Sequence, residues 1–271
     1  MAAHSDAGGG FDVTFHGVRG STPCHGENIV RYGGNTSSFA LAVGSRVVAF
    51  IDAGTGMVSY RFHGLHLAPS LDVFLTHYHW DHIQGLSMLD AVWADEGRLV
   101  IHGPGDPRGA LTAVITPPWF PVSLAESPGV QCETIGRSTN VSGMIVTPFE
   151  VEHPQGAVGY RIDGPTRSLA IVTDHEAGTG RDRTVADAIR GVDVLVHDAQ
   201  YAPSESAIRR GWGHSTWEGA VTAAEAAGAG RLMLTSLDPR STDDDVDGIV
   251  EAVRHRFPDV GVAAPGVEVL L

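Results

Sequence analysis

Three histidines and one aspartate stand within six positions, directly after an apolar run: His77, His79, Asp81 and His82. A strand across the apolar run would aim the first two histidines to one side, because alternate residues of an extended chain share a face. If a helix then starts near Asp81, this aspartate and His82 point to a neighbouring position. Imidazole nitrogen and carboxylate oxygen suit Zn(II), Fe(II) or Mn(II) better than a metal that prefers thiolates. The motif therefore predicts a metal site.

The motif resembles the signature of the metallo-beta-lactamase fold superfamily, whose members place two metals at one edge of a four-layer αββα sandwich. The resemblance extends to Asp52 in an Asp-x-Gly turn, which orients ligands in that family. His153 matches the next ligand position, and Asp174 matches the carboxylate that bridges the two metals. The matches span residues 11–240 and imply the α/β sandwich fold. The metal ligands that they imply are His77, His79, Asp81, His82, His153 and Asp174.

Four further segments resemble the branch that holds ribonuclease Z and related phosphodiesterases: Gly17–Pro23, Tyr32–Thr36, His197–Tyr201 and Gly213–Thr216. That branch pairs a histidine of the Gly-His-Ser-Thr element with an acidic residue of the His-Asp/Glu-Ala element. The resemblance implies that His214 and Asp198 protonate the leaving group, since a carboxylate bonded to an imidazole fixes its tautomer and raises its pKa. The alternative is that His214 only caps a helix and Asp198 only ends a strand.

One ligand position departs from the family pattern. Ser236 stands where the last metal histidine is expected. A serine hydroxyl is a poorer ligand than imidazole, so the second metal should bind more weakly. Three interpretations stay open. The site is binuclear with water or Ser236 in the gap, only the site of His77, His79 and His153 binds tightly, or the chain has kept the fold without activity.

The other histidines receive no catalytic role. His197 is expected to face the opposite side of its strand from Asp198 and to be structural. His175 lies next to Asp174 but has no place in the family pattern. Five others are treated as noncatalytic: His16, His25, His63, His66 and His102.

Apolar patterning broken by glycine-rich turns predicts a two-sheet chain with helices outside. The expected strands are Phe11–Val18, Ser38–Val43, Val47–Asp52, Leu71–Thr76, Leu99–His102, Met144–Val151, Ala157–Ile162, Leu169–Thr173, Val192–His197 and Leu232–Thr235. Helices are expected near Arg183–Arg190, at Trp217–Ala227 and at Val246–Phe257. Ser215 has capping-box spacing to Glu218, and the acidic run Asp243–Asp245 should start the last helix. The proline-rich segment Pro117–Pro128 either lines the pocket or is a surface connection.

Composition favours a single globular domain over residues 1–271, with 1–10 flexible. The chain is 42% hydrophobic, which is enough for a large core. No apolar stretch approaches the roughly 20 residues that span a bilayer, and the start is glycine-rich without a basic and apolar leader. These features predict a cytoplasmic protein. Cys24 and Cys132 are too few for a disulfide framework, so the metal site is cysteine-free.

The net charge of −14 opposes attraction to a nucleic-acid backbone. The tRNA-processing members of the family carry an added arm, commonly between the equivalents of His153 and Asp174. Only about 20 residues separate those positions here, enough for a strand pair. The charge and the missing arm argue against a long nucleic acid and predict a small-molecule substrate. A homodimer stays open.

The implied chemistry is hydrolysis by a metal-bound hydroxide, since a metal lowers the pKa of its water to near 7. Asp81 would both bind the second metal and orient the hydroxide. We expect a phosphodiesterase acting on a small or cyclic phosphodiester, with Zn(II) at both positions, the second weaker, and Mn(II) or Fe(II) as alternatives. Competing hypotheses are an ester, lactone or amide hydrolase with one tightly bound metal, and a non-catalytic binding domain. An oxygen-reducing diiron protein is a lesser alternative.

Overall fold

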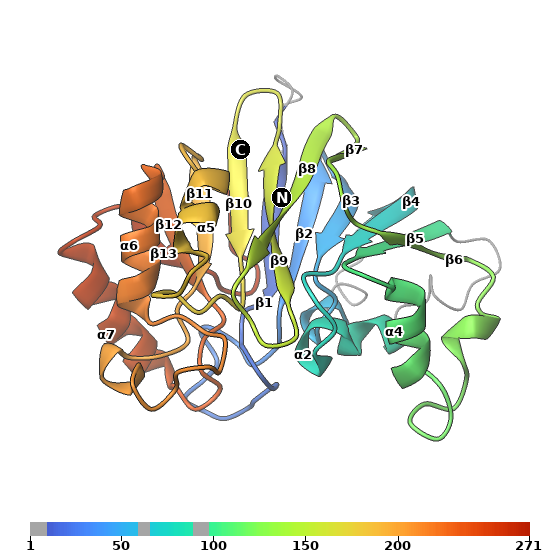
Figure 1. Cartoon of the computed structure of the whole chain (residues 1–271), viewed down its shortest axis with the longest axis horizontal. Coiled ribbons are helices and arrows are strands. Elements are labelled where there is room, and N and C mark those ends of the chain that lie inside the picture. The colour runs from blue at the N-terminus through green and yellow to red at the C-terminus, as the bar shows by residue number, and fades with distance from the viewer. Residues whose placement is uncertain (1–9, 59–65, 89–97) are drawn as a thin grey trace.

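Two seven-stranded β-sheets dominate the computed structural model, which describes residues 10–58, 66–88 and 98–271 (Figure 1). The strand order is β14-β1-β2-β3-β4-β5-β6 in the first sheet and β13-β12-β11-β10-β9-β8-β7 in the second. The first half of the chain and the last strand build one sheet, and the rest builds the other. The flexibility expected of residues 1–10 falls, apart from residue 10, on residues that the structure does not describe, and so does His63.

The strands of the first sheet are β1 (Asp12–Gly17), β2 (Ser38–Val43), β3 (Arg46–Ile51), β4 (His66–Phe74), β5 (Arg98–Gly103), β6 (Val130–Thr134) and β14 (Glu268–Leu270). Those of the second are β7 (Thr139–Val141), β8 (Met144–Val151), β9 (Ala157–Asp163), β10 (Ser168–Val172), β11 (Val194–Asp198), β12 (Arg231–Thr235) and β13 (Val260–Val262). Neighbours from β3 to β6 pair in parallel, as do those from β10 to β13. Each expected strand is present within one or two residues, except that β4 begins earlier, at His66.

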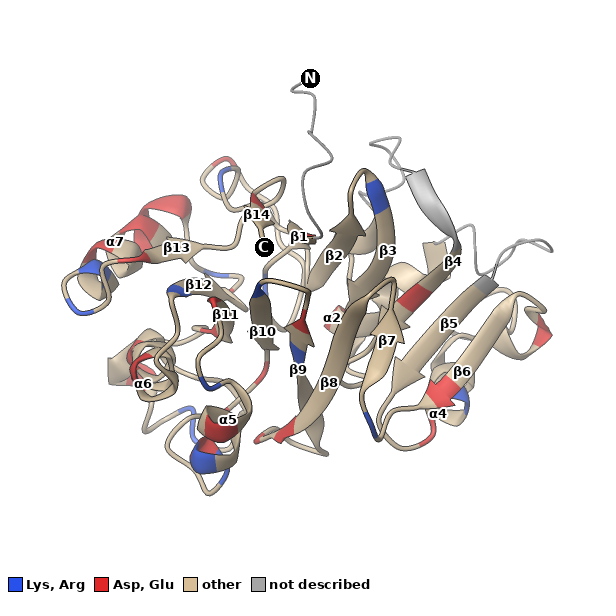
Figure 2. Cartoon of the chain, turned by 90° about the horizontal axis from the view of Figure 1, so that it is seen from above, with Lys and Arg blue, Asp and Glu red and all other residues tan. Residues whose placement is uncertain are grey.

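Helices cover the outer faces of both sheets. Against the first lie α2 (Trp80–Ile83), the 3₁₀ turns η1 (Gln84–Met88) and η2 (Leu124–Glu126), and α4 (Pro107–Val114). Against the second lie α5 (Asp182–Ala188), α6 (Trp217–Ala227) and α7 (Asp243–Arg254), with η3 (Pro203–Glu205) in a connection. Figure 2 shows the layers from above, with acidic residues gathered on α7. The order helix, sheet, sheet, helix confirms the αββα sandwich.

Two apolar clusters hold the layers together. The larger fills the space between the sheets, with Phe15 and Phe39 from the first sheet and Tyr160 and Ile171 from the second, and it continues beneath the helices of the second sheet, where Leu195 lies. The smaller lies beneath the helices of the first sheet: it includes Phe50, Leu75, Leu99, Leu111 and Ile83. Strands β10 and β11 are buried along their whole length, as central parallel strands require.

The predicted start of the last helix is confirmed, whereas the predicted cap of the helix before it is not. Helix α7 begins at Asp243, as the acidic run predicts, with the hydroxyl of Thr242 accepting from the Asp245 N–H. The expected cap of α6 is wrong by one residue. Thr216 caps it by accepting from the Gly219 N–H, whereas the Ser215 hydroxyl donates to the His175 carbonyl and accepts from the Ala177 N–H. Ser215 is therefore used to fix the strand end next to Asp174.

The guanidinium of Arg19 is fully buried and joins three chain segments. Its Nε donates to the Gly33 carbonyl at 2.8 Å, and its Nη1 donates to the carbonyls of Asp238 and Ser241 at 2.9 Å each. The backbone next to it pairs with Leu237, which follows Ser236. Arg19 thus fixes the segment after β12 to the segment after β1.

Arg19→Met should lower the free energy of unfolding by about 3 kcal/mol or more, because it leaves one buried and two partly buried carbonyls without their charged donor. Urea unfolding followed by circular dichroism measures this. Arg46→Met, at an exposed position of β3, is the matched control and should change stability by less than about 0.5 kcal/mol. Equal effects of the two substitutions would contradict the assignment.

Candidate metal centre

The predicted ligands meet at one edge of the sandwich because each follows a strand end or begins the helix after it. His77 and His79 follow β4, Asp81 and His82 lie in α2, His153 follows β8 and Asp174 follows β10. Their ligand atoms form two groups within 4.8 Å, one of His77, His79, His153 and Asp174 and one of Asp81, His82 and Asp174. Both sheets contribute, so the fold itself creates the cluster.

Three imidazoles and one carboxylate converge in the first group. The Nδ1 of His79 lies 2.9 Å from His77 Nε2 and 3.1 Å from His153 Nε2. The Oδ2 of Asp174 lies 3.6 Å from His77 Nε2 and 3.7 Å from His153 Nε2. This is the donor set of three nitrogens and one oxygen that a tetrahedral divalent cation takes.

The second group shares the same carboxylate oxygen. The Nε2 of His82 lies 3.3 Å from Asp174 Oδ2 and 3.2 Å from Asp81 Oδ2. The Oδ2 of Asp174 is therefore the common point of both groups. The backbone N–H of Ser21 donates to Asp81 Oδ2 at 2.8 Å and fixes that carboxylate.

The outer nitrogen of each of the four histidines faces a hydrogen-bond acceptor. His153 Nδ1 lies 2.8 Å from the Gly213 carbonyl, and His82 Nδ1 lies 2.7 Å from Asp52 Oδ2. His79 Nε2 lies 3.1 Å from the Gln155 side-chain oxygen, and His77 Nδ1 lies 3.0 Å from the Thr76 hydroxyl. With the proton assigned to the outer nitrogen in each case, the inner lone pairs face one another. This arrangement orients metal-binding histidines in proteins.

Asp52 is the acceptor that fixes several side chains around the ligand histidines. It is fully buried and accepts from the Thr76 N–H, the Thr76 hydroxyl and the Ser37 hydroxyl as well as from His82. Gly54 follows in the same turn, and a Cβ there would lie 2.2 Å from the Asp81 carbonyl. The Asp-x-Gly turn therefore both orients His82 and lets α2 approach closely.

Unpaired buried atoms and charges show that these residues fit a cation. The Nε2 of His82 and the Oδ1 of Asp174 are buried without a hydrogen-bond partner among the described residues. Burial lowers the pKa of His77 well below its ordinary value, so it is neutral, the form that binds metal. Burial would raise the pKa of Asp174, but His82 and His214 hold it well below its ordinary value. Burial would lower the pKa of His82, but Asp52 and Asp174 raise it well above its ordinary value. These carboxylates thus attract positive charge, either as a proton on His82 or as a bound cation.

His214 and Asp198 form the predicted pair beside the cluster. His214 Nδ1 lies 2.7 Å from Asp198 Oδ2, and its Nε2 lies 4.0 Å from Asp174 Oδ2. Asp198 also accepts from the backbone N–H groups of Gln200 and Ser215. Burial would lower the pKa of His214, but Asp198 and Asp174 raise it to about 9. His214 is therefore protonated at neutral pH.

The residue before His214 shows why this loop has its sequence. Gly213 has φ +82°, and a Cβ there would lie 2.2 Å from His153 Nδ1. Only glycine allows the loop to lie against that imidazole. His214 does not cap α6, since Thr216 does. His197 lies in the core, with its ring 5.9 Å from that of His175, away from the ligand cluster.

Ser236, where the family pattern places a histidine, shares an unusual backbone conformation with Asp52 and Asp174. It is buried at the carboxyl end of β12 and has φ +54°. Asp52 and Asp174, at the ends of β3 and β10, have φ +58° and +50°. Non-glycine residues seldom adopt this left-handed conformation, and it recurs at functional strand ends.

Ser236→His should raise the affinity of the weaker metal equivalent by about tenfold or more, because imidazole replaces a poor donor at a backbone already shaped for a ligand. Metal retained per chain after dialysis against a graded chelator measures this. Ser236→Ala is the matched control and should retain no more metal than the native chain. Identical retention in all three proteins would contradict the expectation.

A cavity of about 510 Å³ opens onto the cluster, lined by Ser21, Tyr78, His79, Trp80, Asp81, His153, Asp174, Tyr201, Trp212 and His214. No residue of Pro117–Pro128 lines this cavity, and Trp119 in that segment is 73% exposed. The segment is therefore a surface connection and does not form a wall of this cavity.

Sequence reasoning missed Ser21, Thr76 and Gln155. Thr76 directly precedes the ligand His77 and Gln155 is two residues after His153, so closeness to predicted ligands was the available signal. Trp80 and Trp212 were missed as well.

Comparison with known proteins decides the family. Residues 47–235 match the family described as beta-lactamase superfamily domain, which is more than half of the chain. The chain belongs to the metallo-beta-lactamase superfamily. Ribonuclease BN of Escherichia coli K12 is 26% identical over 272 aligned residues, covering 78% of this chain and 85% of that protein. The name of this relative agrees with the resemblance of four sequence elements to the ribonuclease Z and phosphodiesterase-like branch.

Solved structures share the whole fold. The metallo-beta-lactamase fold protein YhfI from Bacillus subtilis superposes with a TM-score of 0.75 at 19% identity, over 97% of this chain and all of that one. A diphosphatase from the PhnP family superposes with a TM-score of 0.72 at 18% identity, over 96% of this chain and 97% of that one. The family and the clusters support a metal-dependent hydrolase. No helix in the described parts of the chain is long and apolar enough to cross a membrane.

Proposed function

We propose that the chain is a metal-dependent phosphodiesterase that acts on a small or cyclic phosphodiester. The observation that carries this proposal is the position of Asp174 Oδ2. It lies 3.3 to 3.7 Å from three imidazole nitrogens and 4.0 Å from His214 Nε2. A protonated histidine beside two ligand groups suits cleavage of a phosphodiester, because the departing oxygen needs a proton. The names ribonuclease BN and diphosphatase among its relatives support the same class.

The two ligand groups would each hold a divalent cation. His77, His79, His153 and Asp174 would hold the first, and Asp81, His82 and Asp174 the second, with Zn(II) proposed and Mn(II) or Fe(II) suited to the same donors. A bound cation lowers the pKa of a coordinated water to near 7 and neutralises charge on phosphoryl oxygens. The second group offers three donors rather than four, so its cation should bind more weakly.

The protein's own side chains have separate tasks. Asp198 holds His214 by its Nδ1, so that Nε2 carries the proton offered to the departing oxygen. Asp81, fixed by the Ser21 N–H, is available to accept a hydrogen bond from the attacking water and to orient it. Asp52 keeps the His82 ring in place through Nδ1.

Substrate size follows from the cavity and the charge. A cavity of about 510 Å³ has the size of a small-molecule site. The net charge of −14 opposes a long polyanion. The partner that we propose is therefore a small phosphodiester.

Turnover of methyl 4-nitrophenyl phosphate by the chain loaded with Zn(II) or Mn(II) tests the proposal. Native protein should release 4-nitrophenolate well above a His77→Ala control prepared in the same way. Turnover no greater than that of the control, with two metal equivalents bound, would sink the proposal.

An ester or lactone hydrolase is the second candidate, and Ser236 is the observation that favours it. Attack on a carbonyl needs one cation rather than two, so a weak second position would matter less. A panel of lactones and thioesters separates the candidates, because a phosphodiesterase should leave the panel untouched. A chain that binds no metal yet keeps its thermal stability would instead be a binding domain.

A further inference from the structure

The loop that leads to His214 has no buried residue from Ala202 to Trp212, yet its end touches the metal centre. The Gly213 carbonyl lies 2.8 Å from His153 Nδ1, and His214 is the next residue. A segment without buried side chains has few apolar contacts to fix it. Polar contacts must therefore hold the end of this loop against the ligand histidine.

The carboxylate of Glu176 makes such contacts. The Gly211 N–H donates to both of its oxygens, at 2.9 and 2.8 Å, and the Gly213 N–H donates to Oε2 at 2.9 Å. Both glycines have φ +82°, and turns of this kind can direct neighbouring backbone N–H groups toward one anion. The loop thus forms an anion-binding concavity that the protein fills with its own carboxylate.

The backbone of Glu176 is fixed to the segments that carry two metal ligands. Glu176 lies two residues after Asp174, and its N–H donates at 2.8 Å to the carbonyl of Glu152, the residue before His153. The Glu152 N–H donates in turn to His175 Nδ1 at 3.1 Å. Glu176 therefore joins the strand ends of the metal cluster to the loop of the proposed acid.

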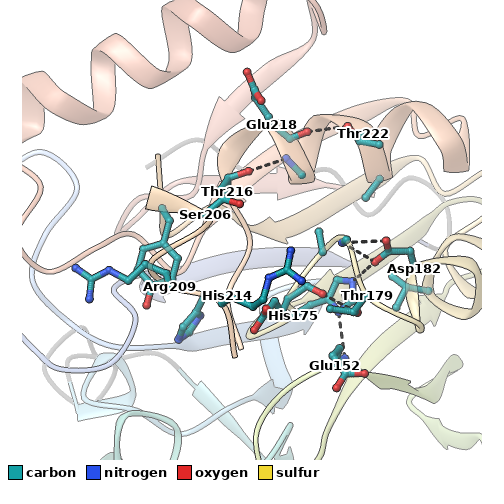
Figure 3. Close-up of a pocket in the computed structure, with 18 of the residues that line it drawn as sticks. Glu152, His175, Thr179, Asp182, Ser206, Arg209, His214, Thr216, Glu218 and Thr222 are labelled. Carbon is teal, nitrogen blue, oxygen red and sulfur yellow. Dashed lines mark hydrogen bonds and ion pairs between the residues drawn. The ribbon is translucent and has the colours of Figure 1, made fainter. Parts of the chain in front are cut away.

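Small solutes can reach the Glu176 side chain. It is partly exposed and lies in the wall of a second cavity of about 670 Å³, together with Gly211. Figure 3 shows His175 and His214 in the wall of the same cavity. Removal of the Glu176 side chain would leave two N–H donors facing this space, where a small carboxylate could take its place.

We propose that Glu176 is a positioning residue that acts through its loop on both His153 and His214. The fixed Gly213 carbonyl accepts from His153 Nδ1 and so keeps the other ring nitrogen aimed at the metal cluster. The same fixed loop end presents His214 to the departing oxygen. The part that concerns His214 rests on the proposed function, whereas the part that concerns His153 rests on metal binding alone.

Metal retention tests the action on His153 without turnover. Glu176→Ala should lower the affinity of the tighter metal equivalent by about 10-fold to 100-fold, the usual effect of losing the partner of a metal-binding histidine. Plasma mass spectrometry after dialysis against a graded chelator measures this. Asp193→Ala is the matched control, because its carboxylate also accepts a backbone N–H, from Ser168 at the opposite end of β10. Native retention in Glu176→Ala would overturn the proposal.

Chemical rescue separates a missing carboxylate from a damaged fold. Acetate added to Glu176→Ala should bind the two free N–H groups and restore several-fold of the lost metal affinity. Acetamide and chloride at the same concentrations should not, and acetate should not raise the affinity of the native chain or of Asp193→Ala. Glu176→Gln should lose affinity without being rescued, because its amide occupies the space. Absence of rescue in Glu176→Ala would overturn the proposal.

Turnover tests the action on His214. Methyl phenyl phosphate has a poorer leaving group than methyl 4-nitrophenyl phosphate, so a displaced acid should slow it more. At saturating metal, Glu176→Ala should lower kcat further for the phenyl ester, with KM nearly unchanged. Equal losses would overturn the action on His214 and leave the phosphodiesterase. No turnover by the native chain, with acetate rescue of metal binding, would overturn the phosphodiesterase and support the action on His153.

Discussion

Asp174→Asn is expected to lower turnover on the order of a thousandfold and to remove at least one metal equivalent per chain. The substitution keeps the shape of the side chain but removes the charge that both ligand groups share. A neutral amide oxygen binds a cation far less strongly than a carboxylate, and electrostatic contacts at the reacting group carry most of catalysis. Plasma mass spectrometry and turnover of methyl 4-nitrophenyl phosphate, on the same preparation, measure both effects.

Asp72→Asn is a matched control for that substitution. Asp72 also pairs with a buried histidine, His102, at 2.7 Å, but it lies on β4 and in neither ligand group. It should keep native metal content and turnover. If Asp174→Asn behaved like this control, Asp174 would not bridge metals and the ligand assignment would be wrong.

His214→Ala should slow cleavage of a poor leaving group by about 10²-fold to 10⁴-fold, the usual contribution of a general acid. A substrate that releases 4-nitrophenolate needs little protonation, so its loss should be within about tenfold. Comparing kcat for a methyl nucleotide ester and a 4-nitrophenyl nucleotide ester measures this difference. Asp198→Asn should show the same pattern more weakly, because it removes only the partner of Nδ1.

The outcome that would contradict the acid role is an equal loss on both leaving groups. His214 Nε2 lies only 4.0 Å from Asp174 Oδ2, so an equal loss would mean that His214 positions the metal cluster. Metal content separates the two cases, because a proton donor can be removed without changing the number of bound ions.

The part of the ligand cluster in the His-x-His-x-Asp-His motif could be predicted from local structure, whereas the two later ligands required the family resemblance. A strand end brings His77 into the cluster, a helix start brings in Asp81, and another strand end brings in Asp174. The pairing of His214 with Asp198 required the family resemblance, since 15 residues separate them and nothing local brings them together. The geometry shows them in contact.

Other features could not be predicted because their signals are weak or non-local. The strands β7, β13 and β14 have three residues each, too short for an alternating pattern. Helix α4 was missed although Asp106 and Pro107 form a recognisable start, with the Asp106 side chain accepting from the Gly109 N–H. The exposure of Trp212 depends on a loop whose conformation is set by Glu176, which is distant in the sequence.

The ligands come from both sheets, so a bound cation would affect how firmly the sheets are joined. His77 and His82 come from the first sheet and its helix, whereas His153 and Asp174 come from the second. A cation bound between them would cross-link two halves of the chain at this edge, in addition to their apolar packing, backbone pairs and side-chain hydrogen bonds such as those of Arg19. Because a ligand that binds only the folded state stabilises it by RT ln(1 + [L]/Kd), the resistance of the catalytic edge to opening would rise with the free-ion concentration of its surroundings.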